Sequence, residues 1–104
     1  MIIQLNADKN LTIHEEYRNK LESLLTEELS RYSDHITRLE VHLSDENGSK
    51  SGVNDKRCLL EARLAGRKPI AVIDIANTHD LSVIGAISKL KPSLETIFGR
   101  LRSH

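Results

Sequence analysis

The spacing of apolar residues changes along this chain from helical to alternating and back to helical, and this change restricts the fold more than any other feature. Between residues 13 and 32 apolar side chains recur every three or four positions, which predicts an amphipathic helix over roughly this range. Thr12 and Glu15 have the spacing of a capping box at its start. The apolar positions are Ile13, Tyr17, Leu21, Leu24, Leu25, Leu29 and Tyr32.

An alternation with a period of two follows, and it predicts strands that are buried on one side. Residues 36–44 and 56–64 alternate in this way, and residues 2–6 form a shorter strand before the helix. Residues 70–76 are apolar apart from Asp74, so we expect this last strand to be the most buried. The inward-facing positions of the two alternating strands are Leu39, Val41, Leu43, Cys58, Leu60, Ala62 and Leu64.

A second helix is predicted after the last strand, with Thr78 or Asp80 as its N-cap. Pro92 falls inside the helical pattern and is expected to kink it, because proline cannot donate the backbone hydrogen bond. Gly99 is a plausible end signal, followed by a frayed basic tail over residues 100–104. The apolar stripe comprises Val83 or Ile84, then Ile87, Leu90, Leu94, Ile97 and Leu101.

The element order is therefore β-α-β-β-β-α, in a chain of 104 residues that suits one domain over residues 1–104. A four-stranded sheet with two helices packed on one face makes a two-layer α+β fold. Residues 45–55 are polar, contain Asn47-Gly48, and predict a flexible hairpin loop.

Nothing in the sequence has the pattern of a catalytic, metal or cofactor site. The five histidines do not pair with other ligands at metal-binding spacings, and Cys58, the one cysteine, fits a buried apolar position. There is no glycine-rich phosphate loop. Neither a signal peptide nor an apolar run long enough to span a membrane is present. We expect a cytoplasmic protein that is not an enzyme and that uses neither a small-molecule substrate nor a membrane.

Charge is divided between the two halves of the chain, although the formal net charge is zero. Residues 1–55 carry six basic and eleven acidic side chains, and residues 56–104 carry nine basic and four acidic ones. If the basic residues converge on one side, they form a phosphate-binding surface suited to structured RNA. Cross-strand ion pairs of Arg57 and Arg63 with Glu40 or Glu61 are the alternative.

The sequence resembles the ribosome hibernation-promoting factor family, also called ribosome-associated inhibitors or sigma-modulation proteins, in its short form. The resemblance covers nearly the whole chain and rests on the element order, on ITRLEVHLS at 36–44 and on SKL at 88–90. More specifically, the sequence resembles a short proteobacterial-type subgroup of this family. This resemblance rests on LSDENG at 43–48, DKRCLLEAR at 55–63 and GRL at 99–101. The region 81–87 and Pro92 depart from the better-known members, whose second helix ends in a richer basic run.

The resemblance implies binding to the small ribosomal subunit, with 16S ribosomal RNA as partner, in the channel used by mRNA and tRNA. Translation would be silenced by occupancy, and without an added dimerisation domain we do not expect ribosome dimers. Matching segments carry the RNA-binding role to Lys56, Arg57, Arg63, Lys89 and Lys91, while Arg67, Lys68 and Arg100 are added from charge alone. The alternative is a non-enzymatic adaptor of the same fold, in which the acidic first helix is the working surface.

Overall fold

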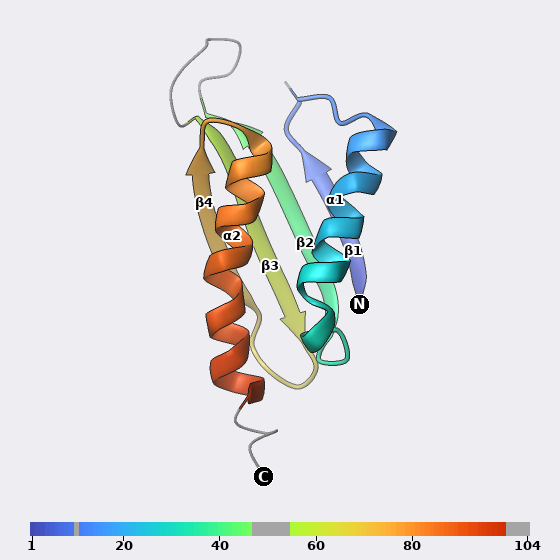
Figure 1. The fold of residues 1–104 in the computed structure, drawn as a ribbon, viewed down its shortest axis with the longest axis vertical. Coiled ribbons are helices and arrows are strands. Elements are labelled where there is room, and N and C mark those ends of the chain that lie inside the picture. Colours follow the sequence, from blue (N-terminus) through green and yellow to red (C-terminus); the bar gives the residue numbers. More distant parts are fainter. Residues whose placement is uncertain (10, 47–54, 100–104) are drawn as a thin grey trace.

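The computed structural model describes residues 1–9, 11–46 and 55–99, and the elements in these ranges follow the predicted order (Figure 1). The loop predicted over 45–55 begins later than predicted, because Asp45 still belongs to a strand. Residues 47–54 of this loop and the predicted tail over 100–104 lie outside the described ranges. The elements are β1 (Ile2–Ala7), α1 (Glu15–Glu28), the 3-10 turn η1 (Ser30–Tyr32), β2 (Ile36–Asp45), β3 (Lys56–Leu64), β4 (Ile70–Ala76), α2 (His79–Leu94) and the π-helical turn η2 (Glu95–Gly99).

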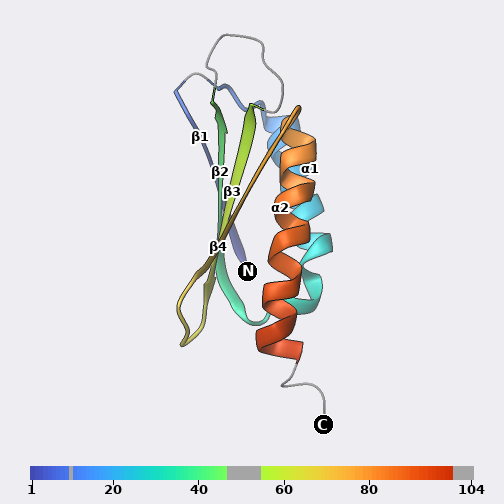
Figure 2. The ribbon, with the colours of Figure 1, turned by 90° about the vertical axis from the view of Figure 1, so that its left-hand side faces the viewer.

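The strands are ordered β1-β2-β3-β4 in one sheet. β1 runs parallel to β2, and α1 supplies the crossover that a parallel pair requires. The β2–β3 and β3–β4 pairs are antiparallel. Both helices cover the same face and leave the other face open (Figure 2). The predicted two-layer α+β architecture is confirmed.

The core lies between the sheet and the two helices. Val41 on β2 faces Leu60 on β3, and Leu43 faces Cys58, so the alternating positions predicted to be inward are buried side by side. Leu21 and Leu25 of α1 are buried above them. The helix α2 contributes Val83, Ala86, Ile87, Leu90 and Leu94.

Helix α1 begins later than predicted, and the capping-box prediction is wrong. His14 occupies the N-cap position and makes no side-chain hydrogen bond to the helix, while Thr12 lies two residues earlier. Glu15 and Glu16 of the first turn still interact favourably with the positive end of the helix dipole. The α-helix ends at Glu28, and the chain then tightens into η1.

The prediction that residues 70–76 form the most buried strand is wrong, because β4 lies at the edge of the sheet. None of its residues is fully buried, and Ala71, Ile73 and Ile75 are exposed on the open face. Periodicity cannot distinguish a short apolar run at an edge from one at the centre of a sheet.

Helix α2 begins as predicted, with Thr78 as its cap: the Thr78 hydroxyl accepts the backbone N–H three residues later at 3.1 Å. Val83 is the buried member of the stripe, and Ile84 is half exposed. The helix runs on through Pro92 without the predicted sharp kink (Figures 1 and 2). Its hydrogen-bonding pattern changes only afterwards, where it widens into η2.

The Cys58 thiol is expected to be unreactive toward thiol reagents in the native protein. Burial, reinforced by the nearby negative charge of Asp74 and opposed by Arg57, raises the pKa of the Cys58 thiol to about 12. Because the thiolate is the reactive form, Ellman's reagent at pH 8 should react roughly 1,000-fold more slowly with the native protein than with the chain unfolded in urea. Equal rates in the two states would contradict the buried position.

The same shift predicts a loss of stability at alkaline pH. The folded state retains the Cys58 proton at pH values where the unfolded chain releases it, so this stabilisation is complete below about pH 8.5. The stabilisation declines as the pH rises toward about 12, which is the pKa of the Cys58 thiol in the folded state. The urea midpoint of the Cys58→Ala variant should therefore fall less steeply between about pH 9 and 11 than that of the native sequence.

Candidate functional site

The open face of the sheet carries an ion-pair network centred on Glu40. Its Oε2 atom lies 2.9 Å from Nη2 of Arg38 and 3.0 Å from Nε of Arg63, and its Oε1 atom lies 3.5 Å from Nε2 of His42. Burial acts to raise the pKa of Glu40, but the hydrogen bond from Arg63 and the charges of Arg38 and Arg63 hold this pKa below its ordinary value. Arg63 also contacts Glu61 of its own strand at 3.2 Å. Of the cross-strand pairs left open by the sequence, Arg63 with Glu40 is formed, whereas Arg57 pairs with Glu46.

A shallow hollow of about 410 Å³ adjoins this network. Arg57 lies at its border, with Nε 3.4 Å from Oε1 of Glu46. The hollow offers hydrogen-bond donors and acceptors of both charges, which suits a polar ligand lying across the sheet. Its lining residues are Asp8, His42, Leu43, Ser44, Arg57, Leu59 and Glu61.

The β4 side of the open face is apolar. Leu59 on β3 is paired with Ile73 on β4, and Ile75 follows on the same side of the strand. Ile73 and Ile75 are 41% and 46% exposed. The open face therefore has a charged half on β2 and β3 and an apolar margin along β4.

Lys56 is held at the end of the sheet by two carboxylates and points to a different surface from Arg57. Its Nζ atom lies 2.6 Å from Oδ2 of Asp45 and 3.4 Å from both carboxylate oxygens of the buried Asp55. The hydrogen bond to Asp45, opposed by burial and aided by Asp55, raises the pKa of Lys56. Lys56 therefore neutralises this buried acid, a role that its sequence neighbourhood did not reveal.

Lys89 and Lys91 extend from opposite sides of α2. Lys89 reaches the edge strand, where Nζ lies 3.0 Å from Oδ1 of Asp74 and donates to the Ile73 carbonyl at 2.7 Å. Lys91 turns toward α1 and lies 2.7 Å from Oε1 of Glu28. These two lysines therefore do not form one basic edge.

Helix α2 approaches Asp74 at Gly85, and the effect of a substitution at this glycine should depend in size on whether Asp74 is present. A Cβ atom at position 85 would overlap the Asp74 carboxylate. Gly85→Ala should therefore displace Asp74 from Lys89 and lose most of the roughly 1 kcal/mol that alanine gains over glycine in a helix. In an Asp74→Ala background the overlap is absent, and Gly85→Ala should stabilise the protein by about 1 kcal/mol in urea denaturation. Equal effects in both backgrounds would contradict the contact.

Arg67 and Lys68 lie in the exposed β3–β4 turn, where Gly66 adopts a φ of 70°. Within the described ranges neither side chain forms an ion pair, although the Arg67 guanidinium lies 5.7 Å from the centre of the Phe98 ring. Phe98 is also stacked on His35, at 4.2 Å between ring centres. Arg100 lies outside the described residues.

The predicted basic residues thus do not converge on a single surface. Arg57 and Arg63 share the open face, Arg67 and Lys68 share the turn beyond β3, and Lys56, Lys89 and Lys91 each pair with acids elsewhere. Arg38 and His42 join the open-face group, and the period-two alternation of residues 36–44 could have placed them there.

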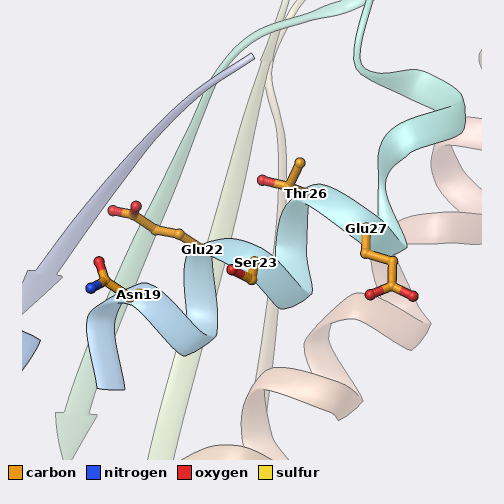
Figure 3. Close-up of a pocket in the computed structure, with 5 residues that line it drawn as sticks. All are labelled: Asn19, Glu22, Ser23, Thr26 and Glu27. Carbon is orange, nitrogen blue, oxygen red and sulfur yellow. The ribbon is translucent and has the colours of Figure 1, made fainter. Parts of the chain in front are cut away.

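The acidic surface considered for the adaptor alternative lies on α1 (Figure 3). A wide hollow of about 540 Å³ is lined only by side chains from this helix, and two of them are carboxylates. These residues are Asn19, Glu22, Ser23, Thr26 and Glu27.

The residues that the structure describes contain no group of His, Cys, Asp and Glu side chains placed to hold a metal ion. None of their helices combines the length and the apolar character needed to cross a bilayer.

Comparison with known proteins finds the same fold among solved structures. No protein-family model matches the sequence, and no curated protein matches it by sequence. The Protein Y N-terminal domain of Thermus thermophilus superimposes with a TM-score of 0.72 at 22% identity, covering 93% of this chain and 99% of that one. A ribosomal subunit interface protein from Coxiella burnetii gives 0.75 at 18%, covering 95% and 99%. These two likenesses confirm the fold that the sequence resemblance implied.

Proposed function

We propose that this protein is a cytoplasmic ribosome-associated factor that binds the small ribosomal subunit and silences translation during stress or stationary phase. The observation that carries the proposal is the shared fold over nearly the whole chain with a ribosomal subunit interface protein. The sequence resemblance supports the same function from separate features. The protein acts by occupying the subunit and catalyses no reaction.

The candidate RNA-binding residues differ in which existing interactions each would have to give up in order to bind a phosphate. Arg67 and Lys68 are exposed and, within the described ranges, pair with no acid, so they are available to phosphates directly. Arg63 and Lys89 must exchange a carboxylate for a phosphate, which costs little because exposed ion pairs contribute only about 0–1 kcal/mol. Lys56 is the least available, since it neutralises a buried acid. Arg57, Lys91 and Arg100 complete the proposed set.

Sedimentation of a stationary-phase lysate through a sucrose gradient tests this function. We expect the protein to migrate with small subunits or whole ribosomes at low salt and to be released as salt rises, because phosphate contacts weaken steeply with salt. A protein that stays at the top of the gradient at low salt would contradict the proposal.

The adaptor function is the second candidate, and the acidic surface on α1 favours it. An interface built on these carboxylates would also weaken with salt, so the binding target, and not the salt dependence, separates the two functions. Purified small subunits and their isolated 16S RNA should both bind under the ribosomal proposal, whereas the adaptor function predicts binding to neither.

A further inference from the structure

The two helices are joined by side chains at three levels and enclose a groove between them. At one end Asp80 accepts hydrogen bonds from Tyr17 at 2.6 Å and from Lys20 at 3.1 Å. In the middle Lys91 pairs with Glu28. At the other end Glu95 accepts hydrogen bonds from the side chains of Arg31 and Tyr32.

The groove is apolar at its base and has a volume of about 270 Å³. Ile84 lies at the opening of the groove and is 50% exposed. Leu81, three residues earlier on α2, is 52% exposed. This volume lies below the usual range of small-molecule pockets, about 300–1,000 Å³, and suits one or two apolar side chains. The lining residues are Leu24, Glu28, Ile84, Ile87, Ser88 and Lys91.

The charge beside the groove indicates what would cover it. Helix α1 carries five acidic and two basic side chains, and both basic ones are engaged: Arg18 donates to the Leu5 carbonyl and Lys20 pairs with Asp80. The last turn of α1 contains no basic residue, so the negative end of its dipole is not compensated. Lys91 and Glu28 neutralise each other at the groove, so the remaining acidic side chains of α1 set the charge beside it. A cationic partner therefore complements this side of the molecule.

We propose that the groove between α1 and α2 docks an amphipathic helix of a partner protein, with apolar side chains in the groove and a polar face rich in Lys and Arg. In helix-in-groove recognition the docked helix carries apolar anchors three or four residues apart, and here these anchors would contact Leu24, Ile84 and Ile87. The surface lies on the side of the sheet opposite to the open face (Figure 2). Lys91 lines the groove and also belongs to the proposed RNA-contacting set, so the inference adds a protein partner that the proposed binding of RNA does not include.

The test uses three synthetic 16-residue peptides and the full chain, without ribosomes. The first peptide has leucines at helical spacing on one face and lysines on the other, the second has glutamates in place of the lysines, and the third has the residues of the first in scrambled order. Methyl NMR titration should show the first peptide binding at least tenfold more tightly than the other two, with shifts at Leu24 and Ile84.

Two matched variants locate the binding. Ile84→Gln should weaken the lysine peptide at least tenfold, whereas Ile75→Gln, on the open face with 46% exposure, should change its affinity less than twofold. Both side chains are half exposed, and circular dichroism checks that both variants fold. Equal effects of the two variants, equal binding of the lysine and glutamate peptides, or absence of binding would each overturn the proposal, and none of these results bears on ribosome binding.

Discussion

Leu60→Ala is expected to lower the free energy of unfolding by about 2–5 kcal/mol, a large share of the roughly 5–15 kcal/mol of a typical domain. Leu60 is fully buried on β3, between Val41 and Val72, so its removal leaves a cavity that the neighbours cannot fill. Leu59→Ala, one position away on the open face, should cost less than about 1 kcal/mol. Urea denaturation followed by circular dichroism measures both.

The pair of variants also tests whether the open face is free in solution. If Leu59→Ala proves as destabilising as Leu60→Ala, Leu59 must be buried by something that covers the face, such as a second copy of the chain. Measuring the urea midpoint at two protein concentrations separates these cases, because a self-association that buries Leu59 makes the midpoint rise with concentration.

The architecture was largely predictable because one face of β2 and β3 is buried and the other is polar. The alternation around Leu39 and Leu60 sets which side chains face the core, and a shift of one residue would expose all of them. β4 lacked this contrast, since Ile73 and Ile75 are apolar on the exposed face. The position of β4 at the edge depends on the order of the strands in the sheet, and the amino-acid composition of a strand does not specify that order.

The candidate site was less predictable, because the contacts that neutralise its cations are distant in sequence. Lys91 pairs with Glu28, 63 positions earlier, and Lys89 on α2 pairs with Asp74 on the preceding strand β4. The acidic and basic halves of the chain did not become two faces of the molecule. β2 and β3 come from different halves but are neighbours in the sheet, so Arg63 meets Glu40.

Reversing the charge of the β3–β4 turn, by Arg67→Glu with Lys68→Glu, is expected to weaken binding to purified small subunits on the order of 100-fold at low salt. These residues pair with no described acid, so the change breaks no ion pair in the described ranges and should leave folding intact. The slope of log affinity against log salt should fall by about 1 for each residue that contacts a phosphate. Filter binding at several salt concentrations gives both quantities.

A single reversal with a matched control separates a local contact from the effect of net charge. Lys68→Glu and Lys9→Glu change the charge equally, and both lysines are exposed in connecting segments. The β1–α1 connection that contains Lys9 lies at the opposite end of the molecule from the β3–β4 turn (Figure 1). Lys68→Glu should reduce both the affinity and the salt slope, and Lys9→Glu should leave the slope unchanged. If the two variants weaken binding equally, the subunit responds to overall charge, and the turn is not where this protein contacts RNA.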